Sequence, residues 1–167
     1  PDIDAIQREA LAALKQALGQ LQSMREDEGG RLATLLVERA RQVREHADAA
    51  AERVPQARNA WYDKMRARLA ELDSEADPAR VEQELIFTAQ RMDVAEEIDR
   101  LHSHVAALES ALDNKQPIGR RLDFLMQEFN REANTLGSKS QDAELTAYAV
   151  EMKVLIEQMR EQVQNIE

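Results

Sequence analysis

The side chains most able to do chemistry lie together on one predicted helix. Asp93, Glu97, Arg100 and His104 are spaced four, three and four residues apart, so a helix places them on one face. Two carboxylates and an imidazole can hold a hard divalent cation, and an imidazole also transfers protons near neutral pH. Acid-rich helix faces are more often simply solvated, however, and Glu97 with Arg100 also fits an ordinary helix ion pair. Spacing alone therefore favours the plainer interpretation without excluding a metal site.

A second group of polar side chains follows in residues 119–135. Glu128 and Glu132 are four residues apart, Arg131 lies between them, and Asn134 follows. Such a face could ligate a metal and contact a phosphodiester, or it could form a buried ion-pair network between two helices. The sequence pattern does not decide between these two interpretations.

The elements that must position these residues are predicted to be helices only. The chain has 167 residues, of which five are Gly, four are Pro and none is Cys. So few turn-forming residues argue against a loop-rich β-sandwich, and the missing thiols exclude disulfide scaffolds, thiolate metal sites and cysteine nucleophiles. No apolar stretch reaches the roughly 18 residues that a membrane span requires. We therefore expect an all-α, cytoplasmic polypeptide without a membrane partner.

Apolar residues recur at helical spacing along most of the chain. They predict helices over about residues 2–24, 31–54, 56–72, 79–113, 119–136 and 141–165. Breaks are predicted at Asp27–Gly30 and at Pro55, which lacks an amide hydrogen, and Asp77 followed by Pro78 is typical of a helix start. The expected organisation is a helical arm over residues 1–80 and a helical domain over residues 81–167. Their long helices should pair as antiparallel hairpins or a bundle that is partly coiled-coil-like.

Charge is unevenly distributed along the chain, whose net charge is −10. Residues 31–68 hold nine Lys or Arg and five acids, whereas residues 69–113 hold three Arg and twelve acids. The basic segment could bind an anionic partner, although two solvated faces that pair with each other explain the same pattern and are favoured by charge alone. The chain has no glycine-rich phosphate loop, no H-E-x-x-H motif and no standard nucleic-acid-binding module. Trp61, Tyr62 and Tyr148 are too few to form a base-stacking platform.

Four runs in the second half resemble the C-terminal region of the YicC endoribonuclease family. They are AQRMDVAEEIDRL at 89–101, GRRLDF at 119–124, QEFNREANT at 127–135 and EQMREQVQNIE at 157–167. The resemblance is dense over residues 81–167 and weaker over residues 1–80, where it rests on helical character and position.

This resemblance implies a bacterial, cytoplasmic, metal-dependent endoribonuclease that cleaves single-stranded RNA. It also implies a homo-oligomer, with a hexamer as the expected size, and an N-terminal domain that this chain is expected to lack. Mn²⁺ or Mg²⁺ is the expected cofactor. The alternative is a non-catalytic helical oligomerisation or adaptor module. Convergence of the polar groups at 93–104 and 120–134 in one cleft would favour the enzyme, and scattered, solvated carboxylates would favour the adaptor.

Under this resemblance the polar residues above gain expected roles. The expected catalytic residues are His104, Glu97, Glu128 and Arg131. The expected metal ligands are Asp93, Glu97, Glu128 and Glu132. The residues expected to contact RNA are Arg39, Arg41, Arg44, Arg100, Arg120, Arg121 and Asn134.

Overall fold

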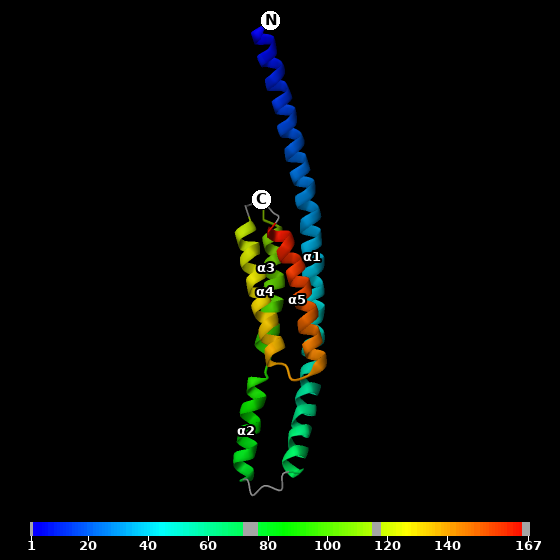
Figure 1. Ribbon diagram of the computed structural model, residues 1–167, viewed down its shortest axis with the longest axis vertical. Helices are drawn as coiled ribbons and strands as arrows, with labels where there is room; N and C mark the ends of the chain where they lie inside the picture. The colour runs from blue at the N-terminus through cyan, green and yellow to red at the C-terminus, as the bar shows by residue number, and fades with distance from the viewer. Residues whose placement is uncertain (1, 72–76, 115–117, 165–167) are drawn as a thin grey trace. The chain divides into compact units, whose positions relative to one another are not determined.

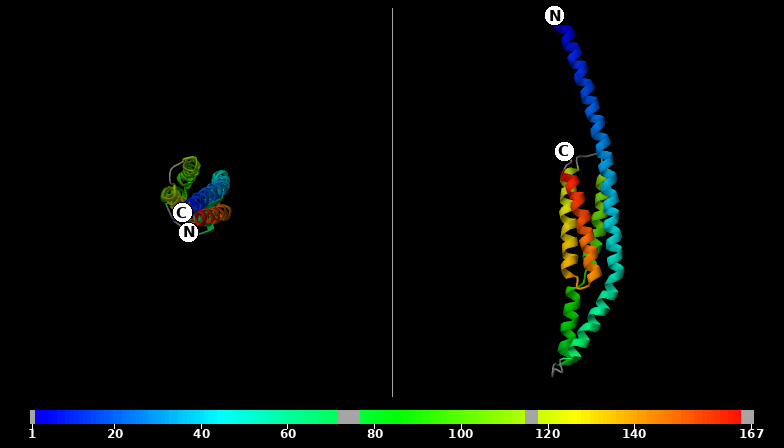
Figure 2. Two further views of the ribbon diagram at one scale, coloured as in Figure 1. Left: turned by 90° about the horizontal axis from the view of Figure 1, so that it is seen from above. Right: turned by 45° about the vertical axis from the view of Figure 1, so that its right-hand side comes forward.

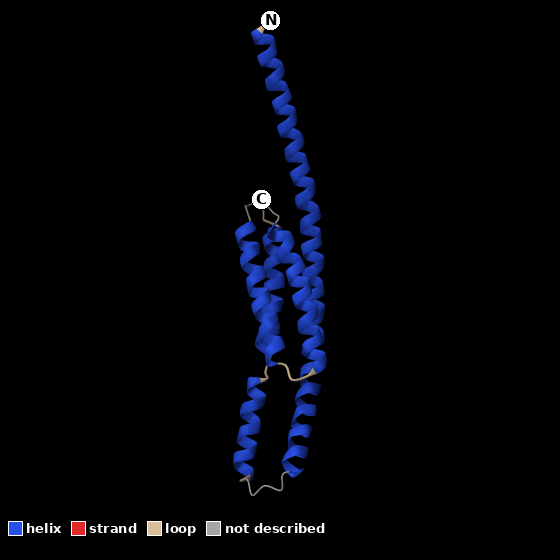
Figure 3. Ribbon diagram, viewed as in Figure 1, coloured by secondary structure: helices blue, strands red, loops and turns tan. Residues whose placement is uncertain are grey.

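Helices are the only regular elements in the described part of the chain. The structure is a computed structural model, and it describes residues 2–71, 77–114 and 118–164. Within these ranges lie α1 (Ile3–Glu71), α2 (Pro78–Arg91), α3 (Ala95–Leu112), α4 (Gly119–Lys139) and α5 (Ala143–Gln164) (Figure 1). Figure 3 shows helices and loops in these ranges and no strand. The all-α prediction is therefore confirmed. None of the described helices offers an apolar stretch long enough to cross a membrane.

Packing divides the chain into two compact units, Pro1–Leu36 and Val37–Glu167, with the boundary inside α1. The first unit, taken by itself, exposes the seven large apolar side chains of residues 3–24, each at 54 to 69% of its surface. These are Ile3, Ile6, Leu11, Leu14, Leu18, Leu21 and Met24. The division by packing does not test the domain boundary predicted near residue 80, which stays a prediction.

α1 continues through both positions at which the sequence predicted a break. A glycine costs about 1 kcal/mol in a helix, and Gly29 and Gly30 lie among strong helix formers such as Leu, Arg and Glu. Pro55 also lies inside α1. Contacts hold the helix on both sides of it, because Trp61 is buried and Arg53 donates to the carboxylate of Asp142, directly before α5. These contacts offset the hydrogen bond that proline cannot make, and the helix curves instead of ending (Figure 2). The three predicted helices are one.

The helix predicted over residues 79–113 is two helices, α2 and α3. Oδ1 of Asp93 accepts a hydrogen bond from the amide of Ala95 at 3.0 Å, and the ammonium group of Lys139 donates to the carbonyl of Asp93 at 3.0 Å. Because an aspartate that bonds to the nearby backbone competes with the helical pattern, α2 ends before Asp93 and a new helix starts at Ala95. The buried side chain of Val94 fixes the junction to the core.

Aspartates also begin α2 and α5. Oδ1 of Asp77 accepts from the amide of Ala79 at 3.0 Å, directly before Pro78, so this predicted helix start is confirmed. At α5 Oδ1 of Asp142 accepts from the amide of Leu145 at 3.0 Å. Ser140 supports that turn by donating to the carbonyl of Asp142.

The second unit contains a four-helix bundle formed by α3, α4, α5 and the stretch of α1 beyond residue 36 (Figures 1 and 2). The colour gradient shows that α1 and α4 run one way and α3 and α5 the other. Each helix buries a stripe of apolar residues spaced three or four apart, and each large buried side chain contributes about 1.5–3 kcal/mol. The largest fully buried residues of this unit are Val43, Val94, Leu101, Leu108, Leu122, Met126, Phe129, Leu136, Met152, Ile156 and Met159.

A glycine sets the spacing of α4 and α5 near the end of α4. A Cβ added at Gly137 would lie 3.3 Å from the Cβ of Ala149, which is tighter than an ordinary carbon contact. The helix predicted over residues 119–136 continues past this glycine to Lys139. The glycine therefore serves close packing, and the extra residues bring Lys139 to the start of α3, beside Asp93 and Glu97.

Candidate metal centre

His104, Glu128 and Glu132 converge where α3 packs against α4. One ring nitrogen of His104 and one oxygen of each carboxylate all lie within 4.8 Å of one another. Glu128 and Glu132 are one turn apart on α4, and His104 reaches them from the antiparallel helix α3. The His104 ring is held by Phe129, whose ring centroid lies 5.6 Å away at an interplanar angle of 68°. The sequence had placed these residues on two separate faces, and the fold joins the faces.

Burial governs the electrostatics of His104. Removal from water lowers the pKa of the imidazole below its ordinary value, and Arg100 lowers it further, whereas Glu132 and Glu128 oppose the shift. The ring is therefore neutral near pH 7, the form that ligates metals. Its Nε2 is buried and has no hydrogen-bond partner within the described residues. The side chain of Glu132 is only 3% exposed.

Arginines border the three-residue centre. Arg100 Nη1 donates to Oε1 of Glu132 at 3.3 Å, and its Nη2 bonds to Glu96 on the neighbouring turn of α3. The hydrogen bond to Glu132 raises the pKa of Arg100, which stays charged. Arg131 lies 4.0 Å from Glu128 and is largely exposed. The centre thus has two carboxylates and one bound guanidinium, with a second guanidinium at its solvent side.

Two predicted metal ligands make other contacts. Glu97, 95% buried, accepts from the ammonium group of Lys139 at 2.8 Å, and its second oxygen has no partner among the described residues. Asp93 caps the amide of Ala95 instead. Neither belongs to the group of ligand atoms around His104. Asp93 and Glu97 precede His104 by eleven and seven residues, so the helical rise places them roughly 16 and 10 Å from the level of His104.

The residues predicted to contact RNA have varied surroundings. Arg39 donates to Gln42 at 3.3 Å, Arg41 pairs with Glu45 at 3.8 Å, and Arg44 pairs with Glu109 at 3.6 Å. Asn134 donates to Asn130. Arg120 and Arg121 are exposed on the first turn of α4 and form no ion pair within the described residues. Their contact with RNA stays a prediction.

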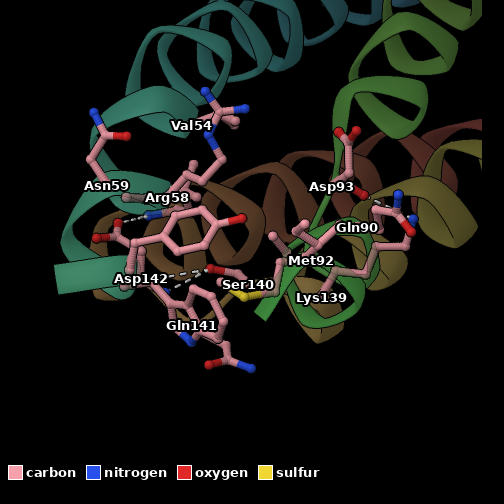
Figure 4. A pocket seen from close by; sticks show the side chains of 16 residues that line it. Val54, Arg58, Asn59, Gln90, Met92, Asp93, Lys139, Ser140, Gln141 and Asp142 are labelled. Carbon is pink, nitrogen blue, oxygen red and sulfur yellow. Dashed lines mark hydrogen bonds between the residues drawn. The ribbon is translucent and has the colours of Figure 1, made fainter. Parts of the chain in front are cut away.

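A pocket of about 430 Å³ opens elsewhere in the second unit, among α1, α2 and the α4–α5 connection. Figure 4 shows Arg58 and Asn59 on its α1 side, and Asp93 and Lys139 on the opposite side. The guanidinium of Arg53 and the carboxylate of Asp142, 2.8 Å apart, hold the α5 start against α1 beside it. None of the three residues of the candidate metal centre lines this pocket. The predicted ligand Asp93 therefore borders a different feature.

Sequence reasoning missed two residues that shape this region. Lys139 neutralises Glu97 from 42 positions along the chain, and no periodic pattern links the two residues. Phe124 is a large side chain with 58% of its surface exposed, one turn before Glu128. The exposure of Phe124 could have been predicted from the sequence. A helical wheel assigns Leu122, Leu125 and Met126 to the core and leaves Phe124 outside that stripe.

Comparisons with known proteins show which sequences this chain resembles. Residues 50–167 match the family described as Endoribonuclease YicC-like, C-terminal. Over 99% of its length the chain is 45% identical to a protein of Haemophilus influenzae named "Probable endoribonuclease YicC". A Clostridioides difficile protein of the same name is 37% identical over 93% of the chain. The chain spans 58% and 54% of the lengths of these two relatives.

Proposed function

The chain belongs to the endoribonuclease YicC-like family, and from this premise we propose that it carries the metal centre of an enzyme that cleaves single-stranded RNA. The observation that carries the proposal is the convergence of His104, Glu128 and Glu132 from two helices. The carboxylates of Glu128 and Glu132 approach each other and repel, and a buried imidazole nitrogen without a partner is also costly. A bound divalent cation would relieve both.

The donor set fits a Mn²⁺-like cation. Ligand atoms bound at about 2.0–2.2 Å stand roughly 3–4.4 Å apart, so separations of up to 4.8 Å need only small side-chain movements. Two carboxylates with one imidazole suit Mn²⁺ better than Mg²⁺, which prefers oxygen ligands and keeps most of its water. Such a cation would polarise a phosphoryl oxygen of the RNA.

The chain's own residues divide the remaining tasks. Glu132, only 3% exposed, holds its place through Arg100, whereas the side chain of Glu128 is 25% exposed and can take a proton from the attacking group. Arg131, 66% exposed beside Glu128, is placed to offset charge on the reacting phosphate. Glu97, predicted as catalytic, pairs with Lys139 outside this centre, and the proposal gives it no part in the reaction.

The cleavage test compares EDTA, Mn²⁺ and Mg²⁺ with a labelled single-stranded RNA. We expect cutting only with metal, and a loss on the order of 100-fold in Glu128→Gln and His104→Gln. Glu157→Gln, on the surface of α5 beside Arg160, is the matched control and should cut normally. Because the chain spans about half of its relatives, the same substitutions are made at the aligned positions of the Haemophilus influenzae protein.

Metal binding is tested separately from activity. Mn²⁺ should raise the melting temperature of this chain, since 100 Kd of a ligand stabilises a fold by about 2.7 kcal/mol. Glu128→Gln should remove the shift. Activity and a Mn²⁺ shift that both survive Glu128→Gln would refute the proposed centre.

Self-association is a second proposal, supported by the apolar residues exposed in the first unit. A helix that exposes seven large apolar side chains over Ile3–Met24 is a typical self-association surface. We expect a homo-oligomer, with six subunits, in light scattering. If these residues assemble the chain but the full-length relative cuts RNA regardless of Glu128, the adaptor alternative replaces the enzyme for this part of the protein.

A further inference from the structure

We propose that Phe124 is a stacking platform for one nucleobase of the RNA strand beside the candidate metal centre. The inference rests on the proposed function and deepens it by assigning a residue that positions the substrate. A benzyl group left in water on a helix that otherwise buries its large apolar residues calls for a partner with a flat apolar face. Nucleobases have such a face, and stacking on an aromatic ring is tolerant of sequence.

The first support is the position of Phe124 on α4. The ring is 58% exposed, while Leu122, Leu125 and Met126 around it are buried. Four residues later comes Glu128, and at about 100° per residue the two side chains lie only about 40° apart around the helix. A base stacked on Phe124 would therefore lie about one turn, or roughly 6 Å, from the carboxylate of Glu128, close to one nucleotide spacing.

The second support is the facing part of α3. Arg100 bonds to Glu132 and His104 packs on Phe129, which sets an antiparallel register between α3 and α4. Continued along α3, this register brings residues 108 and 109 level with Phe124. Leu108 is fully buried in the core, in agreement with a Phe124 ring that α3 leaves exposed.

The third support is charge. Arg120 and Arg121 precede Phe124 by four and three residues, are exposed, and have no ion-pair partner in residues 2–71, 77–114 and 118–164. Arg131, on the other side, is 66% exposed. Phe124 thus lies between unpaired arginines and the centre, in the order that a strand needs: phosphate contacts, base contact, then the reacting phosphate.

The test measures RNA binding in EDTA, where no cutting interferes. The probe is a single-stranded RNA oligonucleotide that carries 2-aminopurine at each position in turn. In the unmodified chain we expect quenching of the 2-aminopurine at one or two positions. Phe124→Ala should abolish that quenching and weaken binding roughly tenfold, and Phe124→Trp should restore both.

The matched control is Phe87→Ala on α2, where a phenylalanine is 49% exposed without a metal centre beside it. It should leave affinity and quenching unchanged. Equal affinity and quenching in Phe124→Ala and the unmodified chain would overturn the stacking role, even if metal-dependent cutting remains. A lower oligomer mass in Phe124→Ala with unchanged RNA affinity would show a protein contact and also overturn it. If the unmodified chain binds no single-stranded RNA, both this inference and the proposed function fail.

Discussion

The ammonium group of Lys139 lies 2.8 Å from Oε1 of Glu97, and it also donates to the carbonyl of Asp93 at 3.0 Å. One side chain at the end of α4 therefore neutralises a buried acid on α3 and holds the junction between α2 and α3. Because Oε2 of Glu97 has no hydrogen-bond partner within the described residues, Lys139 carries most of the compensation for burying this carboxylate.

The first prediction concerns this pair. Lys139→Met should lower the free energy of unfolding by about 2–3 kcal/mol, because a buried carboxylate loses its counter-charge. Urea denaturation measures the loss. Lys153→Met, at an exposed position of α5, should change stability by less than about 0.5 kcal/mol. A second substitution, Glu97→Gln, should recover part of the loss in the Lys139→Met background, and additive losses in the double variant would contradict the pairing.

The second prediction concerns Asp93. Asp93→Ala should cost about 1 kcal/mol of stability, because α3 loses the side chain that accepts from the Ala95 amide. Asp93→Asn can still accept that hydrogen bond and should cost much less. Mn²⁺ affinity should be the same in both variants and in the unmodified chain. A large loss of Mn²⁺ affinity in Asp93→Ala would return this residue to the metal centre.

The third prediction concerns acid unfolding through Asp142. The hydrogen bond from Arg53 lowers the pKa of this carboxyl in the folded protein, and the amides of Leu145 and Glu144 lower it further. The unfolded chain then binds the proton more readily, so the stabilisation is present above the ordinary pKa of about 3.9 and is lost as pH falls toward the folded pKa.

Stability is measured between pH 6 and 2 for the unmodified chain and Asp142→Asn, which keeps the cap. The variant should be less stable at pH 6 and should lose less stability on acidification. Asp63→Asn, at an exposed position of α1, serves as the control. Parallel pH profiles for the unmodified chain and Asp142→Asn would contradict the pairing with Arg53.

The fourth prediction concerns His104 in metal-free protein. Burial lowers the pKa of the ring in the folded state, so the unfolded chain takes up the proton first. Stability should therefore be constant above the ordinary pKa of about 6.5 and should fall as pH drops below it, until the folded pKa is passed. His104→Gln in EDTA should remove this part of the pH dependence, while His102→Gln should leave it in place.

The sequence predicted the helices better than the contacts between them. Asp77 and Pro78 fixed the start of α2, because a cap depends only on neighbouring residues. The breaks predicted at Asp27–Gly30 and at Pro55 were wrong. At Pro55 the burial of Trp61 and the bond of Arg53 to Asp142 act from outside the local pattern. Helix propensity gives the free-energy cost of a residue inside a helix. Tertiary contacts decide whether the helix continues despite that cost.

The candidate metal centre shows the same contrast between local pattern and tertiary contact. Spacing placed His104 on one helix face and Glu128 and Glu132 on another, and both faces were recognised. Which acids meet the imidazole depends on the register between α3 and α4, which a single sequence does not contain. Glu97 lies on the same helix face as His104. Its carboxylate bonds to Lys139, which is 42 positions away along the chain.

The close approach at Gly137 carries an evolutionary consequence. A Cβ at position 137 would lie 3.3 Å from the Cβ of Ala149. The side chains at these two positions therefore share one limited volume. Relatives that keep this crossing of α4 and α5 should show compensating exchanges, in which a side chain larger than hydrogen at the position of Gly137 accompanies a glycine at the position of Ala149. Positions 137 and 149 should therefore co-vary in aligned relatives, and their joint size should be conserved more strictly than either identity.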